Sequence, residues 1–346
     1  MLVMRDIVGG LVFTRRAVGG AKEMVRAEIG GRDALADRIA TAQNAFFVPG
    51  TPIARGPVAG TEAAIRRADR AGLRRLYQRS YVPGRATLVI VGDADPAAVE
   101  AEIVARFSDW AGGAAEVAPA PAPIRIDRGV EARLFVDRKA ATAVTIAAVA
   151  PLGGTDAARR RDALYLEHLA SEMLSRRLQR IAAGKNATFT SASSAIYDHF
   201  ATARLSTVEA AARGADWRGA LRLAALELRR AVEQGFSQAE LDEQLAASRG
   251  GADKAEEAPT IRTLADAIVD AVGRGLVFTV PGDGAAHAAY LARVQLAELN
   301  AAFRSAWTSP ARLVFVSHAR RVPGGEQAIL AAWREAAKVD LGPSPP

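Results

Sequence analysis

A run rich in proline and alanine divides the chain into two unequal parts. Residues 112–123 read Gly-Gly-Ala-Ala-Glu-Val-Ala-Pro-Ala-Pro-Ala-Pro. Alternating prolines fix φ and remove backbone donors, so this run favours an extended linker and prevents a helix. We predict a first domain over residues 1–113, a Pro/Ala linker over 114–129 and a second domain of 217 residues over 130–346.

The second part alternates strand patterns with long helical patterns. Ser237 and Glu240 have the spacing of a capping box, which marks the start of one of these helices. Strands and long helices in mixed order predict an α+β sandwich with helices on one face of a mixed or antiparallel sheet. The predicted strands cover 132–136, 143–149, 187–196, 199–208 and 312–317, and the predicted helices cover 156–183, 217–234, 237 onward, 259–272 and 325–337.

The first part carries a shorter version of the same pattern. It predicts helices over 19–45 and 61–81, a buried strand over 86–91, and a helix that Asp95 and Pro96 open. Its closing Leu-Val-Ile-Val strand matches the Leu-Val-Phe-Val strand near the end of the second part. Because the first copy lacks an opening hairpin and a first long helix, we predict two related α/β domains, the first truncated at its N-terminus.

Cysteine and histidine counts restrict the possible chemistry. The chain has no cysteine, which excludes disulfides, thiolate metal sites and a thiol nucleophile. Its four histidines, His168, His199, His287 and His318, are scattered, so a transition-metal site has few nitrogen ligands to use. None has a partner at ligand spacing, and we interpret all four as structural or surface residues.

The net charge of +7 comes mainly from arginine. Abundant Ala, Gly and Arg are typical of a GC-rich bacterial genome, and arginine pairs on helical patterns favour solvated helix faces over phosphate binding. We therefore expect no nucleic-acid partner; a nucleic-acid-binding protein, the third-ranked hypothesis, would show steeply salt-dependent binding. No run approaches the roughly 18 apolar residues of a membrane span, and no signal peptide is evident, so a bacterial cytoplasmic or periplasmic location stays open.

The end of the first part carries a specific motif order. A helix is followed by Tyr-x-Pro, an apolar strand, Gly-Asp, Asp-Pro and Phe-x-x-Trp, and the order resembles the pitrilysin or insulinase-like zinc metallopeptidases, which include the mitochondrial processing peptidases. The resemblance continues over most of the chain. The segments that carry it are 46–52, 60–61, 73–96, 107–110, 174–178 and 235–241.

The resemblance implies a zinc site of which this chain holds one part. In the family an inverted H-x-x-E-H helix supplies two histidine ligands and a general base, and a glutamate roughly seventy-five residues later is the third ligand. That glutamate matches Glu28, although the family's usual acidic residue seven positions earlier is Ala21 here. The histidine motif would then fall before Met1. The resemblance therefore implies no catalytic residue in this chain, and we expect that the chain alone does not bind zinc.

The second part contains an altered copy of the motif. Leu164-Tyr-Leu-Glu167-His168 has leucine where the first histidine would stand, and the Gly-Gly alignment places Ser248 opposite Glu28. Leucine and serine at these positions indicate a non-catalytic sister domain.

The resemblance implies a zinc-dependent endopeptidase that is inactive as this chain alone. Peptides bind in the family's chamber as an added edge strand, and the second domain would form part of the wall. The alternative is a non-catalytic partner or scaffold subunit of an active homologous peptidase. A truncated first domain would expose apolar surface, which predicts aggregation or a partner.

Overall fold

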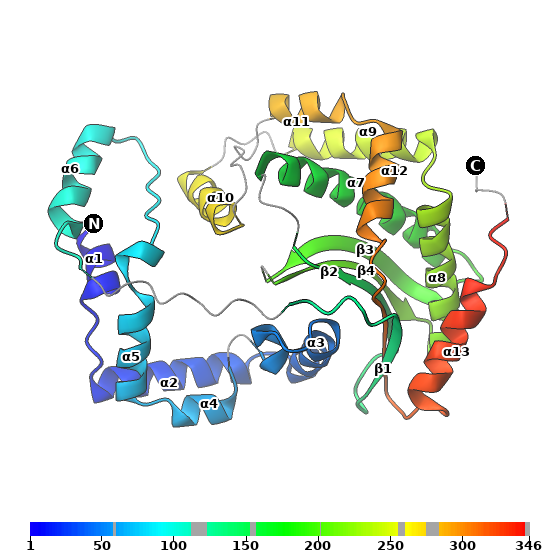
Figure 1. Ribbon diagram of the computed structural model, residues 1–346, viewed down its shortest axis with the longest axis horizontal. Helices are drawn as coiled ribbons and strands as arrows, with labels where there is room; N and C mark the ends of the chain where they lie inside the picture. Colours follow the sequence, from blue (N-terminus) through cyan, green and yellow to red (C-terminus); the bar gives the residue numbers. More distant parts are fainter. Residues whose placement is uncertain are drawn as a thin grey trace.

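One five-stranded mixed sheet forms the centre of the molecule (Figure 1). The computed structural model describes residues 1–57, 60–111, 123–152, 157–200, 202–254, 260–274 and 284–342. The strands lie in the order β1-β5-β2-β4-β3, with β1 parallel to β5 and every other pair antiparallel. They are β1 (Val130–Val136), β2 (Ala143–Ala150), β3 (Phe189–His199), β4 (Ala203–Ala212) and β5 (Arg312–His318).

Long helices cover the first face of the sheet. Alternate residues of the strands, such as Val144 and Ile146 of β2 and Val314 of β5, point into this main core and are almost fully buried. Phe303 and Trp307 close the core from the helix side. The helices that contribute most are α7 (Ala157–Ala182), α8 (Trp217–Glu233), α12 (Leu296–Ala306) and α13 (Gly325–Ala337).

A helix from the first part of the chain covers the second face. Phe46 and Phe47, at the end of α3 (Ala34–Phe47), pack with Leu313 and Phe315 of β5 in a second, smaller core. The ring centroids of Phe47 and Phe315 lie 6.3 Å apart. β5 is an inner strand whose two faces are both covered, which explains why it carries a continuous apolar run. The first part of the chain therefore contributes directly to the sheet's packing.

The remaining helices of the first part bury few side chains. The helices α1, α2, α5 and α6 contain no buried residue, and α4 contains one, Ile65. These elements are α1 (Leu2–Gly9), α2 (Arg15–Gly30), the 3₁₀ turn η1 (Pro52–Arg55), α4 (Glu62–Arg67), α5 (Arg70–Ser80), the 3₁₀ turn η2 (Pro83–Arg85) and α6 (Pro96–Phe107).

The predicted strand over 86–91 is wrong. Within the described ranges this segment pairs with no strand, and the side chains of Leu88 and Ile90 are 39% and 42% exposed. A strand needs a neighbour to take its backbone hydrogen bonds, and the matching strand of the second part, β5, has β1 on one side and β2 on the other. The expectation of two sheet domains is corrected accordingly: the described residues form a single α+β domain with one sheet.

Two predicted helices of the first part are each divided. The pattern over 19–45 becomes α2 and α3, which are separated near Gly31. The pattern over 61–81 becomes α4 and α5. These two are separate because Asp69 caps a new helix, accepting a hydrogen bond from the backbone N–H of Gly72 at 2.6 Å. The helix predicted at Asp95 and Pro96 is confirmed, and Asp95 accepts from the backbone N–H of Ala97.

In the second part, the predicted strands and helices are confirmed with small shifts of their ends. The helices predicted from 237 onward and over 259–272 are α9 (Gln238–Lys254) and α10 (Ile261–Arg274), and α11 (Gly284–Leu291) follows them. No helix is predicted for α1, α11 or α12, and no side chain caps the start of α12. Residues 114–122 of the predicted linker lie outside the described residues. None of the helices in the described ranges is long and apolar enough to cross a membrane.

Both outer strands of the sheet have a helix side chain at their open edge. On β3, the hydroxyl of Ser175 accepts the backbone N–H of Ser194 at 2.8 Å and lies 3.2 Å from its carbonyl oxygen. On β1, a carboxylate oxygen of Glu326 accepts the backbone N–H of Leu134 at 3.3 Å. These contacts occupy backbone groups that an added strand would need.

Candidate functional site

Glu28 lies on α2, a helix of the first part of the chain. Its side chain is exposed, and so is Ala21, which lies about two helical turns earlier on the same helix. The helix is held by contacts to α4: the ammonium of Lys22 donates to the carbonyl oxygens of Arg66 and Ala68, and Arg26 pairs with Glu62 at 3.2 Å. These contacts fix the position of α2 next to α4 and leave the carboxylate of Glu28 accessible.

The residues present do not fit a catalytic zinc ion. Such a site needs three protein ligands around one open position. Within the described ranges, no group of three or more His, Cys, Asp or Glu side chains is placed to hold a metal. Glu28 can contribute one carboxylate, so no chemical step through zinc follows from these residues alone.

The altered motif on α7 forms an ion-pair cluster. Glu167 pairs with Arg204 of β4, which also pairs with Asp198 of β3 at 2.7 Å. These three side chains are 12%, 13% and 5% exposed, respectively. His168 is exposed, and Ser248 accepts a hydrogen bond from Gln244 on α9. The carboxylate at the general-base position of the motif is thus neutralised by an arginine.

The other histidines lie in different surroundings. His199, near the end of β3, lies 2.8 Å from the amide oxygen of Asn44 on α3, and burial lowers its pKa. His318 ends β5, and its Nδ1 accepts the backbone N–H of Arg320 at 2.9 Å. The backbone of His287 belongs to α11, and its side chain lies outside the described residues.

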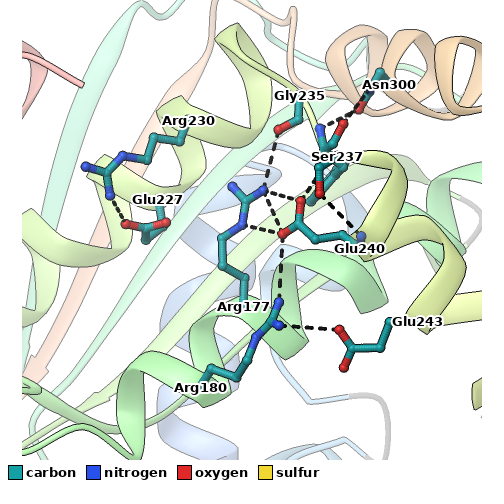
Figure 2. Close-up of polar contacts among 10 residues, drawn as sticks. Arg177, Arg180, Glu227, Arg230, Gly235, Ser237, Glu240, Glu243 and Asn300 are labelled. Carbon is teal, nitrogen blue, oxygen red and sulfur yellow. Dashed lines mark hydrogen bonds and ion pairs between the residues drawn. The ribbon is translucent and has the colours of Figure 1, made fainter. Parts of the chain in front are cut away.

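Two of the motif segments meet at a buried ion pair (Figure 2). The guanidinium of Arg177, on α7, donates to both carboxylate oxygens of Glu240, on α9, each at 2.9 Å. The two side chains are 8% and 13% exposed. Burial raises the pKa of Glu240, but the hydrogen bonds from Arg177 and from the backbone N–H of Ser237 outweigh it, so the net pKa is lowered.

The turn before α9 completes this network. Ser237 and Glu240 form the predicted capping box: each backbone N–H donates to the other's side chain, at 2.9 and 3.3 Å. Gly235 has a φ of 81°, and a Cβ there would lie 2.9 Å from the amide of Asn300. Asn300, on α12, in turn bonds both backbone groups of Phe236.

This network joins α7, α9 and α12, and its charged side chains are paired with one another within the protein. Its function is therefore to hold the helix layer together. The sequence identified Ser237 and Glu240 through the capping box, but it gave no signal for Asn300, because that contact spans 64 positions.

The second face of the sheet also carries polar residues beside α3. Thr145, Glu209 and Ser193 lie side by side on β2, β4 and β3, and Gln43 of α3 donates to Thr145 at 3.2 Å. Burial raises the pKa of Glu209. Sequence reasoning missed this polar strip, because alternate residues of three separate strands supply it.

The sequence model described as peptidase M16 inactive domain matches residues 67–248, which is more than half of the chain. No curated protein sequence matches the chain significantly.

Solved structures share the fold. The chain is similar to the first half of the periplasmic protease PqqL from Escherichia coli, with 17% identity, a TM-score of 0.78, and coverage of 99% of this chain and 75% of that one. Full-length PqqL matches with 17% identity and a TM-score of 0.80 over 99% of this chain, and a mutant of the ferredoxin protease FusC in complex with Arabidopsis ferredoxin matches with 17% identity and a TM-score of 0.79 over 98%. The chain spans 39% of the length of each of these two proteins.

Proposed function

The chain belongs to the peptidase M16 family, and from this premise we propose that it is a non-catalytic portion of a zinc-dependent endopeptidase, inactive by itself. Residues 130–346 are proposed to be the inactive sister domain that forms part of the wall of a peptide chamber. The observation that supports this most directly is the match of the family's inactive domain to residues 67–248, of which 130–248 lie in this portion. The ion pair between Glu167 and Arg204 at the altered motif also supports it, since that carboxylate is already neutralised.

We propose further that residues 1–113 are the last part of a catalytic-type domain. The support is the sequence match of residues 86–91 to β5 and the exposed apolar side chains around them. Leu88, Ile90 and Leu76 are at least 39% exposed. Strands that flank 86–91 as β1 and β2 flank β5 would take its backbone hydrogen bonds and extend the apolar surface that these side chains begin. In this proposal Glu28 is the third zinc ligand, and another polypeptide segment supplies the histidines.

The alternative is that the chain is a partner or scaffold subunit of an active homologous peptidase. The same exposed apolar residues favour it, because a large exposed apolar surface indicates a protein contact. Both proposals place the chain with peptide substrates and a second polypeptide. A bacterial cytoplasmic or periplasmic location is proposed, and the name of the PqqL match, a periplasmic protease, supports the periplasm.

The decisive experiment measures zinc binding and peptide cleavage by the purified chain. We expect no stoichiometric zinc binding in calorimetric titration and no cleavage of a mixed peptide library by mass spectrometry. Stoichiometric binding at micromolar zinc together with peptide turnover would refute the proposal.

A reconstitution then tests Glu28. The chain is co-expressed with a polypeptide that carries an H-x-x-E-H helix, and the zinc content of the purified complex is measured. Glu28→Gln should weaken the affinity for zinc at least tenfold and so lower the zinc content, because a tenfold change in affinity corresponds to only about 1.4 kcal/mol. The matched control is Glu100→Gln, which changes an exposed glutamate on α6. Equal zinc content in the two variants would show that Glu28 is not a ligand.

A further inference from the structure

Exposed arginines gather in one short stretch of the first part of the chain. Between residues 66 and 80 the only acidic residue is Asp69, and its carboxylate accepts the backbone N–H of Gly72 at 2.6 Å. This arginine surface lies on α4 and α5, on the far side of the molecule from the main helix layer (Figure 1). Its exposed residues are Arg66, Arg67, Arg70, Arg74, Arg75 and Arg79.

The geometry of α5 separates its arginines from its apolar residues. At about 100° per residue, the four arginines of α5 fall within one half of the helix circumference. Leu73, Leu76 and Tyr77 fall in the other half. Tyr77 turns toward α1, where its hydroxyl donates to the carbonyl oxygen of Ile7 at 2.8 Å. The arginine half therefore faces solvent.

The neighbouring surface is apolar. The side chain of Leu76, which borders the arginine half, is 50% exposed, and that of Tyr81, directly after α5, is 49% exposed. A surface that combines arginine with exposed aliphatic and aromatic side chains is typical of a protein interface. A nucleic-acid backbone would neutralise the arginines and leave the aliphatic side chains uncovered.

We propose that the arginine surface binds an acidic segment of another protein that also carries apolar side chains. Carboxylates are the complement of guanidinium groups, since they accept two parallel hydrogen bonds from each fork. The charge density would speed the encounter, and the apolar border would bury area in the complex. This inference does not depend on zinc or on peptide hydrolysis, so the two proposals can fail separately.

The test is fluorescence anisotropy of the full chain with a labelled short peptide that alternates Asp and Glu with Leu. The comparison peptide replaces each acid with Asn or Gln. We expect the acidic peptide to bind at least tenfold more tightly at low salt, and the difference to shrink as salt screens the charges.

Variants locate the site. The triple change Arg70→Glu, Arg74→Glu and Arg75→Glu should weaken binding of the acidic peptide at least tenfold. The control reverses three exposed arginines elsewhere, at positions 222, 249 and 334, for the same change in net charge. If the triple variant loses helical circular dichroism, the corresponding glutamine variant replaces it, because glutamine favours helix and removes charge without reversing it.

Several outcomes would overturn the proposal. One is equal weakening by the two charge-reversed sets, which would show a general effect of net charge. Another is tighter binding of a DNA oligonucleotide of equal charge to the same arginines. A third is concentration-dependent self-association that the triple variant abolishes, which would identify a second copy of this chain as the partner.

Discussion

The ion pair between Arg177 and Glu240 gives the sharpest test of how the helix layer is held. In Glu240→Gln the shape of the side chain is kept, but Arg177 loses a bidentate anionic partner in a setting where it is 8% exposed. Breaking a buried pair by removing one charge costs about 3–5 kcal/mol. We expect the lower end, about 3 kcal/mol, because Arg177 keeps a 3.4 Å contact with the carbonyl oxygen of Gly235 and lies 5.1 Å from the centroid of the Phe236 ring.

The assay is urea unfolding of the full chain followed by tryptophan fluorescence. The matched control, Glu243→Gln, removes a carboxylate that is 45% exposed and pairs with Arg180, and it should cost less than about 1 kcal/mol. If Glu240→Gln lowers the free energy of unfolding no more than the control does, the reasoning is refuted. The double variant Arg177→Met/Glu240→Leu should lower the free energy of unfolding by less than the sum of the two single variants, because it leaves no unpaired charge.

Low pH should remove the contribution of the Arg177–Glu240 ion pair to stability. The pKa of Glu240 is lowered below its ordinary value of 4.5 in the folded protein. Its contribution to the free energy of unfolding is therefore fully present above that value and is lost as the pH falls through the lowered pKa. The stability difference between wild type and Glu240→Gln should shrink over the same range. A difference that stays constant in acid would contradict the role of the charge.

Three further outcomes are expected. Phe47→Ala should lower the free energy of unfolding by about 3–5 kcal/mol, because it leaves a cavity in the second core. Hydrogen exchange should then show loss of protection in α3, and unchanged exchange would refute that packing. Asp95→Ala should cost about 1 kcal/mol by removing the cap of α6, seen as reduced helical circular dichroism, with Asp93→Ala as the uncapped control. Because the pKa of His199 is lowered, stability should fall as the pH drops below about 6.5, and His199→Gln should flatten that dependence in thermal melts.

Local signals explain which elements the sequence could predict. Asp95 and Pro96 determine the start of α6 through their own side chains, and Ser237 and Glu240 do the same for α9. These features depend on residues within one helical turn. The apolar runs of β2 and β5 are also local signals, because a strand that is buried on both faces is apolar along its whole length.

The errors concern features that depend on distant residues. Residues 86–91 carry a strand pattern as clear as that of β5, but the described residues offer them no neighbour, so the same pattern gives different structures. The placement of α3 on the second face of the sheet follows from Phe46 and Phe47 meeting Phe315, more than 260 positions away. For the candidate site, the resemblance supplied the position of Glu28, and the structure places no co-ligands near it among the described residues.

The side chains at the sheet's edges affect whether another strand can join the sheet. An incoming peptide strand at the centre of β3 would have to displace the hydroxyl of Ser175 from the backbone of Ser194 before it could pair. The same applies at β1, where Glu326 occupies the N–H of Leu134. These two contacts therefore oppose strand addition at the backbone of Ser194 and of Leu134.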